Sequence, residues 1–208
     1  NRGYFMDDPD FPAIRVSWER ANAFCAWLSQ KLGKRVSLPT EAQWEWACRA
    51  GSATPMHFGG VDDDFSKSEN LADYMFIEFA VTGVDPKPFA LGTDPNPAKL
   101  PPAIYDYELR DRRFNDGVLH LAKVGSYAPN AWGLHDMHGN AAEWTSSAYR
   151  PYPYDAADGR ENSSADERKV VRGGSWYRRQ HRATSSWRWG YPGWMRPFDV
   201  GFRVVIED

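Results

Sequence analysis

Apolar residues recur at helical spacing in one segment near the start of the chain. They would share one face of a helix, and they are Ala21, Phe24, Cys25, Leu28 and Leu32. Ser17 can cap such a helix at its N-terminus, and Gly33 supplies a stop at the other end. The pattern therefore predicts a helix that follows Ser17 and runs through about Leu32.

A second helix is predicted in the segment LPTEAQWEWACRAG, residues 38–51. Thr40 and Gln43 stand at the spacing of a capping box, in which each side chain bonds the backbone N–H of the other. Gly51 would end the helix. One face of this helix would carry apolar residues, namely Trp44, Ala47 and Cys48.

From about residue 51 to residue 127 no helical or strand periodicity is visible. The run DDD at 62–64 is typical of a solvated turn, and the segment 84–106 holds too many prolines for a helix or a central strand. Later, RKVVRGGSW (168–176) and DVGFRVV (199–205) have the β-branched and aromatic composition of strands. We expect an α+β fold that is rich in loops, with two helices early and short strands late.

Composition agrees with a loop-rich fold. Aromatic residues make up 15% of the chain and include ten Trp, while 17 Gly and 15 Pro provide many turns among which these rings must pack. A length of 208 residues predicts one domain, residues 1–208. The net charge of -3 argues against nucleic acid or an anionic membrane as a general partner. No apolar run approaches the roughly 20 residues of a membrane span.

The cysteines and histidines do not indicate a metal site or a catalytic group. Cys25 and Cys48 lie among apolar positions of the two predicted helices, which favours buried, inert thiols, although a bridge between them stays open. Only His135 and His138 have suggestive spacing, and on a loop with no third ligand nearby they favour a surface feature over a metal site. His181 lies near several serines, but nothing in the sequence orients it for catalysis.

Four segments together resemble the formylglycine-generating enzyme family, also called the sulfatase-modifying-factor domain. They are VSWERANAFCAWL, LPTEAQWEWACRAG, NAWGLHDMHGNAAEWT, and RGGSW followed by VGFRV. The resemblance runs from about Pro12 to Val205 and keeps the family's order. It implies a modified C-type-lectin-like fold. The family domain usually opens with a stretch before the VSW helix, so we expect that this portion is cleaved or absent.

The resemblance also bears on whether this chain can oxidise cysteine with copper. Family members that oxidise a cysteine to formylglycine carry two cysteines shortly after GGS, which bind copper(I), an ion that needs thiolate ligands. Arg178 and Ala183 stand at those places here. We therefore expect no copper and assign no catalytic residue. The sulfoxide synthases of the family hold iron through a separate helical domain, which this chain has no room for.

A different segment offers oxygen ligands for a metal ion. In GLHDMHGNAAEW, two carboxylates flank a glycine-containing turn, and hard oxygen ligands suit calcium. The resemblance implies two structural calcium sites. The first would use the side chains of Asp136 and Glu143 with the carbonyls of Gly139 and Ala141. The second would use the side chains of Asn70 and Asp116 with the carbonyls of Leu71 and Val118.

An aromatic and basic segment follows RGGS, in a region that borders the peptide groove of the family's enzymes. The candidate groove residues are Ser175, Trp176, Tyr177, Arg178, Arg179, His181, Arg182 and Trp187. Arginines there would favour a carboxylate, sulfate or phosphate, and stacked aromatic rings would suit sugars. Equally, the Trp rings could complete the core while the arginines stack on them or pair at the surface.

Three functions remain open. The favoured hypothesis is a calcium-stabilised binding or accessory domain without redox chemistry, which recognises a peptide, a glycan or a partner protein. The alternatives are an enzyme of the family, acting by formylglycine generation or another oxidation, and a scaffold subunit of a larger assembly. A partner chain or an upstream segment could complete the domain. Use of calcium favours a location outside the cytoplasm, because cytosolic free calcium is too low to fill weak sites.

Overall fold

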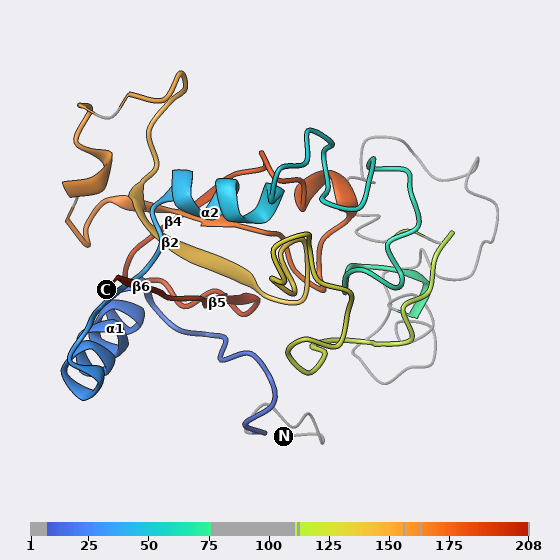
Figure 1. Ribbon diagram of the computed structural model, residues 1–208, viewed down its shortest axis with the longest axis horizontal. Helices are drawn as coiled ribbons and strands as arrows, with labels where there is room; N and C mark the ends of the chain where they lie inside the picture. The colour runs from blue at the N-terminus through green and yellow to red at the C-terminus, as the bar shows by residue number, and fades with distance from the viewer. Residues whose placement is uncertain (1–7, 76–110, 112, 156, 163, 208) are drawn as a thin grey trace.

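The computed structural model describes residues 8–75, 111, 113–155, 157–162 and 164–207. Two α-helices come first, α1 (Trp18–Leu32) and α2 (Glu41–Arg49), with the short strand β1 (Arg35–Ser37) between them. Five strands and two 3-10 turns follow in the last third of the chain. The expected α+β, loop-rich architecture is confirmed, and Figure 1 shows the helices and strands in one half of the molecule and long loops in the other.

Both helices begin where the capping signals predict. The Ser17 side chain accepts a hydrogen bond from the backbone N–H of Arg20, and Gly33 adopts the left-handed conformation with φ 65°. At α2 the full capping box between Thr40 and Gln43 is present. The predicted end at Gly51 is too late, because Ala50 already adopts the left-handed conformation and its N–H closes the last turn.

A four-stranded sheet forms the centre of the protein, in the order β4-β3-β2-β5. These strands are β2 (Ala142–Ala148), β3 (Arg168–Arg172), β4 (Trp189–Pro192) and β5 (Val200–Phe202). Strand β3 pairs antiparallel with both β4 and β2, whereas β5 runs parallel to β2. The C-terminal strand β6 (Val205–Glu207) pairs antiparallel with β1 in a separate two-stranded sheet. The two strand segments predicted from the sequence are found as β3 and β5, each shorter than predicted, and β6 begins at the last residue of the second segment.

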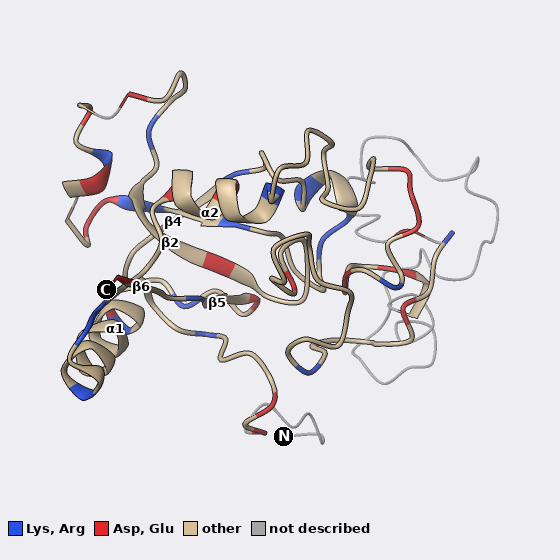
Figure 2. Ribbon diagram, viewed as in Figure 1, with Lys and Arg blue, Asp and Glu red and all other residues tan. Residues whose placement is uncertain are grey.

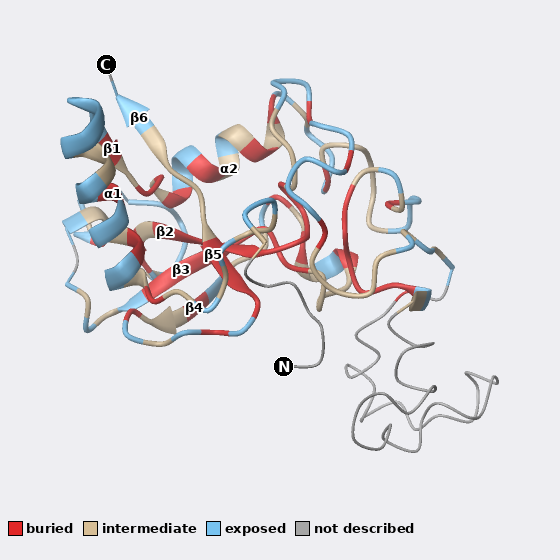
Figure 3. Ribbon diagram, turned by 90° about the horizontal axis from the view of Figure 1, so that it is seen from below, coloured by how far each residue is buried: buried red, intermediate tan, exposed pale blue. Residues whose placement is uncertain are grey.

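The largest buried cluster joins α1 to the sheet. Trp144 of β2 is completely buried there, together with Ala21 and Cys25 of α1. The predicted apolar face of α1 is only partly buried, since Phe24 and Leu32 stay 42% and 47% exposed. Figure 3 shows this difference, with β2 and β3 mostly buried and much of α1 exposed.

The loops pack around a smaller cluster of their own. Met56, Phe65, Leu71 and Ala183 are buried in it, so residues 51–75 are tied to the segment that follows β3. The three aspartates at 62–64 are exposed in a turn, as predicted. The proline-rich segment 84–106 lies outside the described residues.

Cys25 and Cys48 are both free and buried, and they belong to different clusters. The bridge that the sequence left open is therefore absent from the structure. Figure 2 shows Lys and Arg interspersed with Asp and Glu along the described chain. Among the described residues, no helix has both the length and the apolar character that crossing a membrane requires.

Candidate functional site

A groove opens between β4, the turn that follows β3, and the start of β5. Its lining is Ala142, Val171, Arg172, Gly174, Arg178, Arg182, Trp187, Trp189, Tyr191, Asp199 and Val200. Trp189 and Tyr191 alternate with Gly190 along β4, so both rings face this side of the sheet. The groove is open to solvent, and the cavity within it is small, about 30 Å³.

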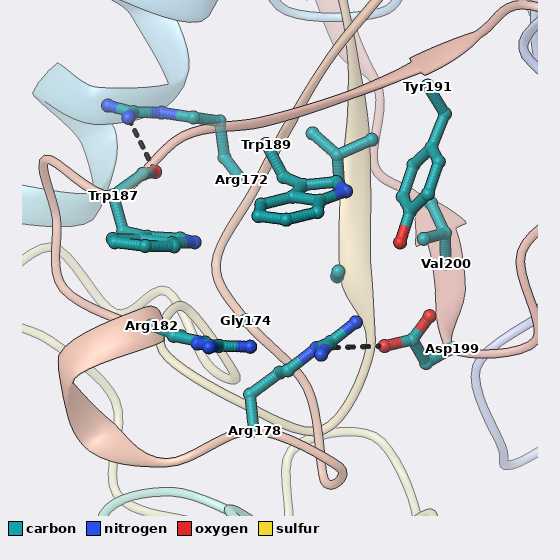
Figure 4. A pocket seen from close by; sticks show the side chains of 11 residues that line it. Arg172, Gly174, Arg178, Arg182, Trp187, Trp189, Tyr191, Asp199 and Val200 are labelled. Carbon is teal, nitrogen blue, oxygen red and sulfur yellow. Dashed lines mark hydrogen bonds and ion pairs between the residues drawn. The ribbon is translucent and has the colours of Figure 1, made fainter. Parts of the chain in front are cut away.

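Two indole rings and two guanidinium groups face one another across this groove (Figure 4). The rings of Trp187 and Trp189 are nearly parallel, with centroids 6.4 Å apart and 17° between their planes. Arg178 and Arg182 lie on the opposite wall, below the two indole rings in this view. The groove thus combines an aromatic wall with a cationic one.

Arg172 holds Trp187 in position. It lies at the end of β3, is 1% exposed, and donates from Nη1 to the carbonyl of Trp187 at 2.7 Å and from Nη2 to the carbonyl of Ser185 at 2.8 Å. Its charge is balanced by a salt bridge to Glu45, and Glu41 Oε1 lies 3.7 Å from Nη1. This buried network connects α2 to the aromatic wall.

Asp199 holds the cationic wall. Its Oδ2 accepts a hydrogen bond of 2.9 Å from the Ser175 hydroxyl and lies 3.6 Å from Arg178 Nε. Its Oδ1 is buried, and within the described part of the chain it has no hydrogen-bond partner. A buried carboxylate oxygen without a donor is costly, so Oδ1 is a position where a ligand donor would bind favourably.

The structure divides the groove residues named from the sequence into two sets. Arg178, Arg182 and Trp187 line the groove. The lining does not include Ser175, Trp176, Tyr177, Arg179 and His181. Ser175 is completely buried and acts through Asp199, while Trp176 packs on His120 and Phe198.

Sequence reasoning missed several lining residues, namely Arg172, Trp189, Tyr191 and Asp199. For two of them a signal was present. Trp189 and Tyr191 stand two residues apart, the spacing of one strand face, in a segment that the sequence did not predict as a strand. Nothing local marks Asp199, which reaches the groove because β5 returns to the sheet.

Arg178 and Ala183, which the family resemblance matches to the cysteines of the oxidases, have different environments. Arg178 projects into the groove, but Ala183 is 0% exposed and packs with Met56, Phe65 and Leu71. No cysteine or methionine is among the described residues that line the groove.

At the second calcium set, Asn70 and Asp116 have buried oxygens. Asn70 Oδ1 and Asp116 Oδ2 find no hydrogen-bond partner among the residues that the structure describes. Asp116 Oδ1 accepts from the backbone N–H of Val118 at 2.7 Å, which brings two of the four expected ligand residues into contact. Burial, reinforced by the neighbouring Asp73 carboxylate, raises the pKa of Asp116 to about 7. These features fit a bound cation.

The first calcium set fits less fully. Asp136 Oδ1 is buried without a partner in the described chain, and burial raises the pKa of this carboxyl group. Glu143 is already engaged, because Arg203 donates to both of its oxygens, at 2.6 and 2.7 Å, and Trp44 Nε1 donates to Oε2 at 2.6 Å. No cluster of three or more His, Cys, Asp or Glu suited to a metal occurs within the described ranges. Any cation here would therefore rely on Asp136 and backbone carbonyls such as those of Gly139 and Ala141.

His138 is not the surface residue that the sequence suggested. It is completely buried, with Nδ1 2.7 Å from the carbonyl oxygen of Ala183 and Nε2 accepting from the backbone N–H of His57 at 2.9 Å. Cys48 Sγ lies 3.4 Å from the same Nε2. Burial lowers the pKa of His138 to about 3, so it is a neutral core residue. His135 is half-buried and bonds the carbonyl of Tyr127 instead.

Comparison with known proteins identifies the family. Residues 2–208 match the domain described as "Sulfatase-modifying factor enzyme 1-like domain". The chain belongs to this family. The domain is 33% identical to "Formylglycine-generating enzyme" of Bos taurus over 138 residues, which is 66% of this chain and 27% of the relative. It is 28% identical to "Inactive C-alpha-formylglycine-generating enzyme 2" of Bos taurus over 202 residues, which is 94% of this chain and 50% of the relative.

A solved structure supports the fold of this sulfatase-modifying-factor domain. "Structure of PvdO from Pseudomonas aeruginosa" superposes with a TM-score of 0.67 at 27% identity, covering 96% of this chain and 63% of that one. The chain thus has a fold of the formylglycine-generating enzyme type. It spans half or less of the length of the two curated relatives, at 27% and 50%.

Proposed function

We propose that this sulfatase-modifying-factor domain is a binding or accessory module without redox chemistry, whose groove recognises a glycan, a peptide or a partner protein. The main support for the proposal is the chemistry of the residues at and near the groove. Where the family's oxidases present thiols, this groove presents Arg178, paired with Asp199, and position 183 is an alanine packed in the core. Guanidinium and methyl groups can neither bind copper(I) nor form a mixed disulfide.

The two cysteines of the chain cannot replace the missing thiols. Cys25 is buried against the sheet, and Cys48, on the buried face of α2, lies beside His138. Burial raises the pKa of the Cys48 thiol to about 12, so this group stays protonated at neutral pH, whereas the thiolate is the form that reacts and binds metals. The similarity to a relative called inactive supports the same conclusion.

Copper-dependent turnover tests this proposal directly. The purified chain is loaded with copper(I), given a cysteine-containing peptide and oxygen, and the peptide is analysed by mass spectrometry. An active formylglycine-generating enzyme serves as the positive control. We expect unmodified peptide with this chain. Formylglycine formation above the level of a copper-only blank would refute the proposal and establish the enzyme alternative.

The proposal includes calcium in a structural role. Bound near Asn70 and Asp116, an ion would give the partnerless oxygens a ligand and connect residues near 70 to those near 116. An ion that binds only the folded state raises the free energy of unfolding, by about 2.7 kcal/mol when its concentration is 100 times its Kd. Removal of calcium by EDTA should therefore lower the melting temperature. An unchanged melting temperature with no calcium in the purified protein would contradict this role. Such weak sites favour a location outside the cytoplasm.

A further inference from the structure

We propose that this protein has a second binding site, a cavity beside Asp136 that takes a small organic cation, a protonated amine on an apolar body. This inference goes beyond the function of the groove, because the linings of the groove and of the cavity have no residue in common. It depends on three features of the cavity: its volume, its apolar walls, and a carboxylate that forms no ion pair in the described chain.

The cavity is large enough for a small molecule. Its volume is about 530 Å³, whereas the cavity in the groove measures about 30 Å³. Ligand sites usually measure about 300 to 1,000 Å³. The lining includes residues 11–13 near the N-terminus, and two bonds hold this segment to the loop that supplies Val124. The backbone N–H of Val124 donates to the carbonyl of Asp10 at 2.9 Å, and Lys123 forms a salt bridge of 2.8 Å with Asp10.

Most of the lining is apolar. The apolar residues come from four segments of the chain, and with Gly125 they are Phe11, Pro12, Ala13, Val124, Ala141 and Phe202. Phe11 and Phe202 are half-buried, so part of each ring remains accessible. Such walls favour a ligand with an apolar body, and the face of a phenyl ring also attracts a cation.

One carboxylate of the lining is left without a balancing charge. Arg203 and Glu143 neutralise each other, since Arg203 donates to both oxygens of Glu143 at 2.6 and 2.7 Å. Asp136 Oδ2 accepts from the backbone N–H of Gly125 at 2.9 Å, but its buried Oδ1 has no hydrogen-bond partner in the described chain. Two carboxylates and one guanidinium thus give the lining one net negative charge when His135 is neutral.

The uncharged polar groups of the lining do not satisfy Asp136. The Asn140 side chain bonds the backbone of Ala122, accepting at Oδ1 and donating from Nδ2. His135 Nδ1 lies 2.7 Å from the carbonyl oxygen of Tyr127 and must donate to it, so a neutral His135 ring keeps Nε2 as an acceptor. The cavity therefore favours a ligand that donates hydrogen bonds, and a protonated amine supplies both the donors and the positive charge.

Calcium fits this cavity less well than an amine does. The expected calcium set combines Asp136 with Glu143, but both oxygens of Glu143 already accept from Arg203. Asp136 is then the one carboxylate available, whereas calcium takes roughly six to eight oxygen ligands. The nearby guanidinium of Arg203 also repels a divalent ion more strongly than a monovalent one.

Three probes of one shape test the ligand class on the full chain, with isothermal titration calorimetry as the readout. Phenylbutylamine, phenylbutanol and phenylbutyrate share an apolar body and differ in charge. We expect the amine to bind at least about tenfold more tightly than the alcohol, because its hydrogen bond to Asp136 joins two charged groups. Phenylbutyrate should bind most weakly, since its carboxylate is repelled by that of Asp136. Saturating calcium should leave the affinity for the amine unchanged.

Matched variants locate the binding. Asp136 has φ 58°, a left-handed conformation that Asn also adopts, so Asp136→Asn keeps the backbone and an oxygen for Gly125 while it removes the charge. This variant should bind the amine no more tightly than the alcohol. Asp166→Asn, at an exposed position outside the lining, should leave the affinity unchanged. Phe11→Ala should weaken the amine and the alcohol alike, and melting temperatures identify any loss of folding.

Several results would overturn the proposal. It fails if none of the three probes binds, if the amine and the alcohol bind equally well, or if phenylbutyrate binds most tightly. It also fails if Asp166→Asn weakens the amine as much as Asp136→Asn does. Competition between calcium and the amine, lost in Asp136→Asn, would assign the buried oxygen to the metal ion instead.

Discussion

The buried ion pair between α2 and the segment before β4 offers the sharpest test of what stabilises this fold. Glu41 is 1% exposed, and its two oxygens accept from Arg188 Nε at 2.5 Å and Nη2 at 2.6 Å. A second buried guanidinium, that of Arg172, lies 3.7 Å from Oε1. Replacing Glu41 by Gln preserves the shape but leaves two positive groups facing an amide instead of a carboxylate.

The magnitude follows from burial. Removing one partner of a buried ion pair costs about 3 to 5 kcal/mol, and solvent screening is small because the Arg188 and Glu41 side chains are 8% and 1% exposed. For a domain of this size each kcal/mol lowers the melting temperature by about 2 to 4 °C, so Glu41→Gln should lower it by roughly 6 to 20 °C. Differential scanning calorimetry at neutral pH measures the shift.

Glu19→Gln is the matched control. Glu19 lies in the first turn of α1 as Glu41 lies in the first turn of α2, but it is exposed. Both substitutions remove a favourable interaction with the helix dipole, worth up to about 1 kcal/mol, and only Glu41→Gln also removes a buried charge. If the two variants melted within about 2 °C of each other, the reasoning from the buried pair would be wrong.

The remaining predictions concern the buried thiols and a close backbone approach. Cys25 and Cys48 should resist a thiol reagent in the native protein and both react once it is unfolded. Because the pKa of Cys48 is about 12 when folded and near 9 when unfolded, stability should fall as pH rises from 9 toward 12, measured by urea unfolding, and Cys48→Ala should remove that contribution. Gly174→Ala should cost at least about 2 kcal/mol, since its Cβ would lie 2.6 Å from that of Ala183, whereas Gly117→Ala, also at positive φ but with nothing within 4 Å, should cost only about 1. Equal losses in the two glycine variants would show that the close contact is unimportant.

The helix starts could be predicted because their signals are local. Ser17 and the Thr40–Gln43 pair bond backbone groups within three residues of themselves, so the sequence alone contains the interaction. The central strand β2 has no such signal. Its sequence AEWTSSA is buried along most of its length, so it lacks the alternation of a half-buried strand, and its small and polar residues are satisfied only by neighbours far away in the chain.

The groove shows the same division. The aromatic and basic segment after RGGS predicted Arg178, Arg182 and Trp187 as groove residues. The acceptor Asp199 could not be foreseen, because it meets Arg178 only when β5 pairs with β2. The sequence by itself determined the family, the helix caps and the absence of groove thiols, all of which depend on residue identity at short spacing. Only the tertiary structure decided which side chains share the hollow and which charges are balanced, because those depend on contacts between segments that the chain brings together from a distance.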